Sequence, residues 1–115
     1  MNKYTELSDF EINKKVAENL KLNTIAYERT EIVLFDDMDA TPFDPCNNPT
    51  DAMPIIIDNL ISLMADMSED GGATWWCASD ISNGITSRYK SNPLRAAMEV
   101  FLMMKDAENE NNNNS

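Results

Sequence analysis

The stretch from Cys46 to Met67, CNNPTDAMPIIIDNLISLMADM, holds the densest mixture of apolar side chains and turn signals in the chain. Its Asn-Asn-Pro segment is typical of a helix start, because an Asn side chain accepts from a free backbone N–H and Pro suits the first helical position. A short helix over residues 49–58 is therefore predicted, although Pro54 removes a hydrogen bond inside it. The three isoleucines at 55–57 indicate burial on more than one side.

After this helix the pattern changes to a period of two residues, which predicts a strand over 60–67 with one apolar face. A Ser-Glu-Asp-Gly-Gly turn follows, and ATWWCA over 73–78 has the composition of a second strand. Residues 60–78 are therefore expected to form a β-hairpin. Trp75 and Trp76 are adjacent, so they face opposite sides of the sheet. We expect both to be covered, since an exposed Trp would instead be an anchor for a partner.

Helical periodicity recurs near both ends of the chain. Ser8 and Glu11 form a capping box in front of an amphipathic helix over residues 9–20. Asn-Pro at 92–93 begins a second amphipathic helix, which is predicted to run to about residue 107. Both patterns are those of helices that pack one face against a sheet.

Two further segments complete the layout. AYERTEIVLF over 26–35 is predicted as one strand, and the polar segment 79–91 is predicted as a loop with an Asn-Gly turn. The elements do not alternate regularly enough for a parallel doubly wound sheet. We therefore predict an α+β fold, in which a small antiparallel sheet of about three strands, built on the 60–78 hairpin, is packed by the N-terminal and C-terminal helices. Residues 1–107 are expected to form this single domain, followed by a disordered Asn-rich tail over 108–115.

The composition excludes several chemistries. The 115 residues contain no histidine, so Ser-His and Cys-His nucleophile activation and His-based acid–base catalysis cannot be built from this chain. Cys46 and Cys77 are too few for a zinc site of four cysteines; two free thiols in a reducing compartment are the simplest state, with a disulfide between them left open. The three glycines, at positions 71, 72 and 84, do not have the spacing of a GxGxxG or P-loop motif. No cofactor, metal or catalytic residue is therefore expected.

The acidic residues concentrate in the middle of the chain. The net charge is −11, and residues 28–70 hold eleven acids and one base, a net −10. Such a segment repels phosphate backbones, so direct binding to nucleic acid is not expected. No apolar run reaches the length of a membrane span, and the polar N-terminus shows no signal peptide, so no membrane association is expected either.

Four of these acids, Asp36, Asp37, Asp39 and Asp44, lie in the segment 36–46, whose two prolines predict a loop. Their density suggests a site for a hard cation. The spacing, however, lacks the central Gly and the final Glu of an EF-hand. A solvated acidic loop is therefore the interpretation that we prefer.

Three blocks of the sequence resemble the NinX-like family of small phage and prophage proteins: LSDFEINKKVAE, DPCNNPTDAMPIIIDN and NPLRAAMEVFLMM, in this order. The resemblance extends from Leu7 to about Asp106, and it departs at Met53, where family members often carry an aromatic residue. It brings no catalytic residues. It implies a phage-encoded accessory protein in the cytoplasm of a bacterial host.

Three functions are compatible with these observations. The leading one is a non-enzymatic module that binds a host or phage protein. Its candidate partner-binding residues are Asp36, Asp37, Asp39, Asp44, Trp75 and Trp76. The second is a DNA mimic, in which the acids between Glu28 and Asp70 imitate a phosphate array and occupy a DNA-binding protein. The third, a hydrolase with Mg²⁺ on the acidic loop, is disfavoured because an exposed loop does not separate the pKa values of paired acids.

Overall fold

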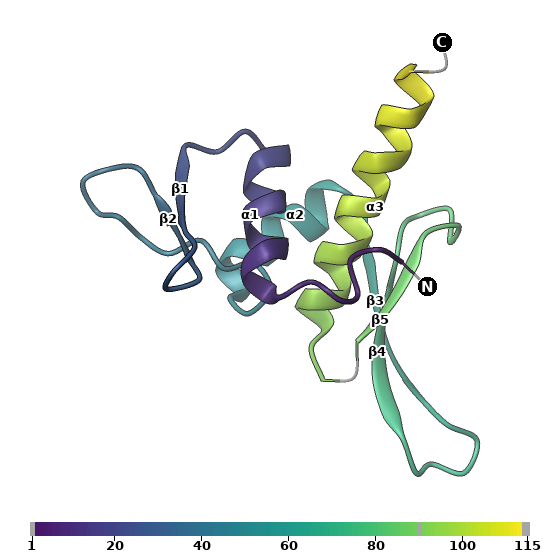
Figure 1. The fold of residues 1–115 in the computed structure, drawn as a ribbon. Helices are drawn as coiled ribbons and strands as arrows, with labels where there is room; N and C mark the ends of the chain where they lie inside the picture. The colour runs from purple at the N-terminus through teal and green to yellow at the C-terminus, as the bar shows by residue number, and fades with distance from the viewer. Residues whose placement is uncertain (1, 90, 114–115) are drawn as a thin grey trace.

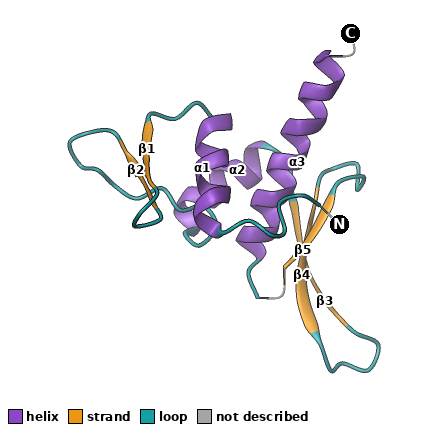
Figure 2. Ribbon diagram, viewed as in Figure 1, coloured by secondary structure: helices purple, strands orange, loops and turns teal. Residues whose placement is uncertain are grey.

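The computed structural model describes residues 2–89 and 91–113, and it has an α+β fold, as predicted (Figure 1). Within these residues the elements are α1 (Asp9–Asn19), β1 (Thr24–Tyr27), β2 (Ile32–Phe35), α2 (Pro49–Asp58), β3 (Ser62–Met67), β4 (Thr74–Ser79), β5 (Thr86–Tyr89) and α3 (Pro93–Asn113). The strands form two separate antiparallel sheets, one of β1 and β2 and one in the order β3-β4-β5 (Figure 2).

The helices begin where the capping residues indicate. The side-chain oxygen of Ser8 accepts from the N–H of Glu11 at 3.1 Å, and the side chains of Asn48 and Asn92 accept from backbone N–H groups in the first turns of α2 and α3. These bonds satisfy N–H groups that have no partner within the helix. Helix α2 continues through Pro54, as predicted, because its apolar face is held in the core.

The segment predicted as one strand over 26–35 is instead a hairpin, in which β1 and β2 pair from Thr24 opposite Phe35 to Tyr27 opposite Ile32. Its charged centre, residues 28–31, is the turn. This turn contains no Gly, Pro, Asn or Asp, so the sequence carries none of the usual turn signals there. The prediction of a single strand was therefore wrong.

The larger sheet has three antiparallel strands, as predicted, and the hairpin of β3 and β4 is confirmed. Its third strand is not the 26–35 segment but β5, which lies inside the segment 79–91 predicted as a loop. The prediction missed β5 because Thr-Ser-Arg-Tyr has no alternation of apolar and polar residues. Ser87 is its one buried residue and bonds to helix α3, and Tyr89 is half-buried against the core.

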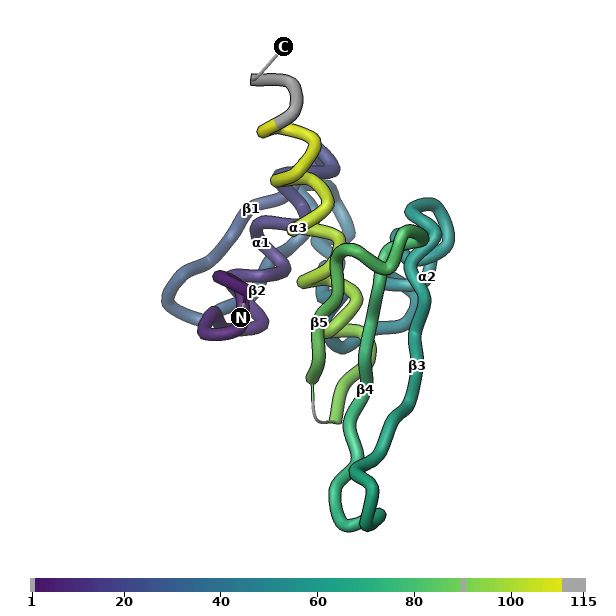
Figure 3. Tube along the Cα trace, turned by 90° about the vertical axis from the view of Figure 1, so that its right-hand side faces the viewer, coloured from purple at the N-terminus to yellow at the C-terminus, as the bar shows by residue number. Residues whose placement is uncertain are grey.

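Helix α3 is the element against which the others pack. It contacts α1 and α2 as well as all three strands of the larger sheet, which lies across it in Figure 3. Its residues Ala97, Met98 and Phe101 have no exposed surface, and they belong to the same apolar cluster as Ile12 and Val16 of α1. Of the two terminal helices predicted to pack the larger sheet, α3 does so, whereas α1 packs on α3 and β2.

The two tryptophans of β4 are both half-buried and face opposite sides of the sheet. Trp76 lies opposite Tyr89 and is two residues before the buried Ala78. Side chains two residues apart on a strand share a face, and Ala78 lies opposite Ser87, which bonds to α3, so Trp76 also faces α3. Trp75 lies on the other side, where the guanidinium carbon of Arg88 is 5.2 Å from the centre of its ring. The ring N–H of Trp75 is buried without a hydrogen-bond partner among the described residues.

Helix α3 continues to Asn113, beyond the end expected near residue 107. Of the predicted disordered tail, residues 114 and 115 lie outside the described residues. The division of the chain into a domain of residues 1–107 and a separate tail stays a prediction. None of the helices in the described part of the chain combines the length and the apolar character that crossing a membrane requires.

Candidate partner-binding cleft

A cleft of about 250 Å³ opens between helix α1, strand β2 and the chain that follows β2. Its walls come from residues 9–13, 31–33 and 42–47. These segments meet because the chain after β2 folds back along the strand: Leu34 forms an isolated bridge with Pro42, and the N–H of Phe43 donates to the carbonyl of Val33 at 2.8 Å. The cleft is therefore built by contacts that are local to the small sheet and the first helix.

The floor of the cleft is apolar. The side chains of Phe10, Val33 and Phe43 line it and are at most 7% exposed. The ring of Phe43 is fixed by an edge-to-face contact with Phe35, with 5.6 Å between the ring centres. An apolar stem that entered the cleft would therefore meet preformed aromatic and aliphatic surface.

Two carboxylates on one side of the cleft are linked by an amide. Asp44 Oδ1 accepts from Asn13 Nδ2 at 2.8 Å and from Asn47 Nδ2 at 3.1 Å. The same Asn47 amide donates to Asp9 Oδ2 at 3.2 Å. Asn13 is 6% exposed, so its bond holds the Asp44 carboxylate against the protein interior. The position of Asp44 is thus fixed by two amide donors.

A third carboxylate comes from the turn between β1 and β2. Glu31 is exposed and lines the cleft at the start of β2. Its φ of 56° is uncommon for a residue other than Gly, and the hydrogen bond from its N–H to the carbonyl of Tyr27, 2.8 Å long, holds that conformation. Among the described residues that line the cleft, none is Lys or Arg.

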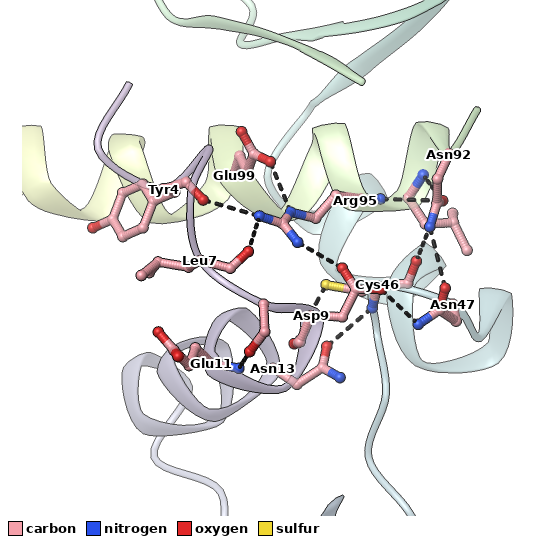
Figure 4. A network of polar contacts seen from close by, with 12 residues as sticks. Tyr4, Leu7, Asp9, Glu11, Asn13, Cys46, Asn47, Asn92, Arg95 and Glu99 are labelled. Carbon is pink, nitrogen blue, oxygen red and sulfur yellow. Dashed lines mark hydrogen bonds and ion pairs between the residues drawn. The ribbon is translucent and has the colours of Figure 1, made fainter. Parts of the chain in front are cut away.

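Behind the cleft, Arg95 of α3 holds Asp9 in place (Figure 4). The guanidinium of Arg95 is 2% exposed and donates to Asp9 Oδ1 at 2.6 Å and to Glu99 Oε2 at 2.7 Å. It also donates to the backbone carbonyls of Tyr4 and Leu7 at 2.9 and 2.7 Å. The charge of Asp9 is therefore already paired, and Glu31 and Asp44 are the carboxylates left to attract a cation into the cleft.

The pKa of Arg95 lies above its ordinary value. Burial alone would lower that pKa, but the hydrogen bonds to Asp9 and Glu99 raise it by more. Arg95 therefore stays protonated, and its ion pairs join the N-terminal segment, α1 and α3 at one point. This network supports the cleft from behind: Asp9 lines the cleft, whereas Arg95 and Glu99 do not.

Cys46 belongs to the same support. The residue has no exposed surface, its N–H donates to Asn13 Oδ1 at 3.1 Å, and its Sγ lies 3.8 Å from the carbonyl oxygen of Asp9. Burial, followed by the nearby charge of Asp9, raises the pKa of the thiol far above its usual range. Cys46 and Cys77 are both free thiols, which answers the pairing question that the sequence leaves open.

Of the sequence-predicted residues, Asp44 is the one that the structure brings to this cleft. The predicted loop is confirmed, and Asp36, Asp37 and Asp39 are exposed on it. Asp37 Oδ1 accepts from the N–H groups of Asp39 and Ala40 at 3.0 and 2.8 Å, so this carboxylate shapes its own loop. Within the described residues, no three His, Cys, Asp or Glu side chains are grouped so that they could hold a metal ion.

Trp75 and Trp76 lie on the larger sheet and do not line the cleft. Conversely, the sequence analysis did not single out Asp9, Asn13 or Glu31. One signal was available: Asn13 is a polar residue on the buried face of an amphipathic helix, one turn after Asp9, and such residues usually have a specific partner. Glu31 was not singled out because the turn that carries it was predicted as the middle of a strand.

The fold and this cleft define a small α+β protein with an acidic cleft above an apolar floor. The family model described as "Bacteriophage P22, NinX" matches residues 3–105, and the chain therefore belongs to this phage protein family. The match confirms the resemblance that the three sequence blocks indicate, and it makes the chain a phage accessory protein. No curated protein and no solved structure matches the chain.

Proposed function

We propose that this phage accessory protein is a non-enzymatic binding module in the cytoplasm of the bacterial host, and that its cleft receives a basic side chain of a host or phage protein. One observation carries the proposal: the carboxylates of Glu31 and Asp44 flank an apolar floor in a cleft whose described lining contains neither Lys nor Arg. A Lys or Arg side chain fits this arrangement because its stem is apolar and its head is cationic.

The size of the cleft supports a side chain over a larger ligand. Its volume is about 250 Å³, whereas pockets for drug-sized molecules and cofactors range from about 300 to 1,000 Å³. The guanidinium of an Arg would add a further advantage, since its planar donors can pair with a carboxylate through two parallel hydrogen bonds. Asn13 and Asn47 hold the carboxylate of Asp44 in place mainly through Oδ1, so Oδ2, 3.3 Å from the Asn47 amide nitrogen, keeps more capacity to accept from a cationic head.

The charge of the surrounding chain supports a basic partner. Residues 28–70, which supply two of the three walls of the cleft, carry a net charge of −10. A concentrated field of one sign raises the rate at which an oppositely charged partner arrives. The interaction should therefore weaken steeply as salt screens the exposed charges.

The test is an affinity capture of host and phage proteins with three tagged proteins: the wild type, Glu31→Gln and Glu6→Gln. Both substitutions remove one exposed carboxylate, and Glu6 does not line the cleft. At about 50 mM salt, we expect Glu31→Gln to retain up to about fivefold less of a given basic protein than the wild type, the range of an exposed ion pair. Glu6→Gln should retain as much as the wild type.

Two outcomes would contradict this proposal. Equal retention by all three proteins would mean that the cleft is not the binding site. Exposed charges are largely screened at about 500 mM salt. If the wild type retained as much of the basic protein at this concentration as at about 50 mM, charge would not drive the contact.

A second candidate function, mimicry of a DNA phosphate array, is favoured by the exposure of Asp36, Asp37 and Asp39 on the loop after β2. For a mimic, the triple variant with Asn at these positions should lose a captured DNA-binding protein. The cleft variant Glu31→Gln should keep it. The two proposals therefore predict opposite rankings of the same two variants.

A further inference from the structure

Strand β3 is the outermost strand of the larger sheet. The order is β3-β4-β5, and β3 pairs with β4 along Ser62–Met67. No described strand pairs with its other edge. Five of its six residues are exposed, so the edge is also not covered by side chains of other elements. An uncovered edge is a row of backbone donors and acceptors that another strand can use.

The register shows which backbone groups point outward. The N–H of Ser68 donates to the carbonyl of Ala73 at 2.9 Å, which makes these two residues a hydrogen-bonded pair. Such pairs alternate along an antiparallel ladder. The N–H and C=O groups of Leu63, Ala65 and Met67 therefore point away from β4. The N–H of Met67 already donates to Asp66 Oδ1 at 2.8 Å.

This edge lacks the features by which proteins usually block strand addition. Those features are Lys or Pro on the strand, a bulge, or a very short strand. The sequence of β3, SLMADM, contains no Lys and no Pro. Its pairing with β4 is continuous over all six residues, so there is no bulge. The one charge on the strand is Asp66.

The surroundings of the edge indicate the chemistry of an added strand. Asp66 is followed by Glu69 and Asp70 in the turn, and the sequence has no Lys or Arg between Arg29 and Arg88. Exposed apolar side chains accompany these acids, since Met64 is 58% exposed and Met67 61%. A strand that alternates basic and apolar residues complements both features. A second copy of this chain does not, because it brings the same acids and a net charge of −11.

We propose that the free edge of β3 receives an extended, basic segment of a partner protein as a fourth strand of the sheet. The N–H and C=O groups of Leu63 and Ala65 and the C=O of Met67 supply the main-chain hydrogen bonds. The acids of β3 and the following turn select Lys or Arg on the added strand. This surface is separate from the cleft, and the proposal does not depend on what the cleft binds.

The probe is a fluorescein-labelled peptide of alternating Lys and Val residues, followed by fluorescence anisotropy. Its control is the same peptide with N-methyl groups on all of its backbone amides. The two peptides carry the same charge, but the methylated one has no N–H group left to donate from either of its edges. We expect the wild-type protein to bind the unmethylated peptide at least about tenfold more tightly, because several backbone hydrogen bonds are lost with the methylated one.

The matching protein variant is Ala65→Pro, which removes the central outward N–H. Pro is tolerated on an edge strand where the N–H faces solvent, and Ala65→Thr serves as a control that keeps this group. We expect Ala65→Pro to bind the peptide as weakly as the wild type binds the methylated peptide, and Ala65→Thr to bind it normally. Both peptides carry the Lys side chains that the cleft would receive, so the difference between the two peptides reports on the edge and not on the cleft.

Each remaining outcome would overturn the proposal. Equal binding of both peptides to the wild type means that charge alone attracts them. No binding of either peptide means that the edge is closed. A dimer in sedimentation that Ala65→Pro dissociates means that the occupant is a second copy. Because the comparison of the two peptides uses only the wild type, the proposal stays testable even if Ala65→Pro fails to fold.

Discussion

Arg95 Nε donates to Glu99 Oε2 at 2.7 Å, one turn apart on α3, and neither side chain is more than 2% exposed. Residues four positions apart on a helix lie side by side, so the two side chains can pair wherever the helix forms. Glu99 Oε1 also accepts from Ser87 Oγ at 2.8 Å, which ties β5 to the helix. One buried ion pair therefore connects the sheet, the last helix and, through Asp9, the wall of the cleft.

Replacing Glu99 with Ala should lower the free energy of unfolding by about 3–5 kcal/mol, because it leaves the Arg95 charge buried with one partner fewer. The matched control is Glu108→Ala, which breaks the exposed pair with Lys105 on the same helix, 3.3 Å long, and should cost less than about 1 kcal/mol. Denaturant unfolding measures both. If the two variants lost the same stability, the network would not support the fold.

Tyr4 should make stability depend on alkaline pH. Its hydroxyl donates to Asp106, and burial, then this bond, raises the pKa of Tyr4 above its usual value. A group whose pKa is raised by folding stabilises the protein below its unfolded pKa, about 10 for Tyr, and loses that contribution as the pH rises further.

The check is denaturant unfolding of the wild type and Tyr4→Phe between about pH 7 and 11. The free energy of unfolding of the wild type should exceed that of Tyr4→Phe by a constant amount up to about pH 9. This difference should shrink steadily above about pH 10. A difference that does not change across this range would show that the phenol is not held protonated by the fold.

The two thiols should react at different rates. Cys46 has no exposed surface and its pKa is raised by burial, whereas Cys77 is half-buried on β4. A thiolate is the reactive form, so Cys46 should stay unmodified until the protein unfolds. Titration with a disulfide reagent should therefore find one reactive thiol in the native wild type and none in Cys77→Ser. Two equally fast thiols would contradict the packing of Cys46.

Lys21 should be replaceable by Gly with a gain in stability. It follows the end of α1 with a φ of 57°, a position where Gly is the usual residue. Lys21→Gly should raise the free energy of unfolding by about 0.5–1 kcal/mol relative to Lys21→Ala, which removes the same charge but keeps a Cβ. Thermal or denaturant unfolding of the two variants gives the comparison, and a more stable Ala variant would rule out backbone strain there.

The sequence was sufficient for the elements that carry their own local signals. Ser8, Asn48 and Asn92 mark helix starts through side-chain bonds to nearby N–H groups, and such bonds need no tertiary structure. The hairpin of β3 and β4 was equally predictable from its period of two and its Gly-containing turn. The α+β class follows from these elements.

Strand β5 and the cleft, which the sequence did not predict, depend on contacts between residues that are distant in the chain. Strand β5 has no apolar alternation and exists because it pairs with β4 and because Ser87 bonds to Glu99, twelve positions later. The cleft requires Asp9, Glu31 and Asp44 from three separate segments. No local pattern brings them together; the fold-back of the chain after β2 and the hold of Arg95 on Asp9 do so.

The central claim, that the cleft accepts a basic side chain, is tested most directly by nuclear magnetic resonance of the ¹⁵N-labelled protein. A short peptide with one central Arg is added, and a twin peptide carries citrulline, which has the same shape but no charge. The account predicts that the Arg peptide shifts the amide signals of Phe10, Val33 and Phe43 and that the citrulline peptide does not. It also predicts that Glu31→Gln weakens the effect. Equal shifts with both peptides, or shifts at exposed acids such as Asp66 and Asp70 in place of the cleft, would contradict it.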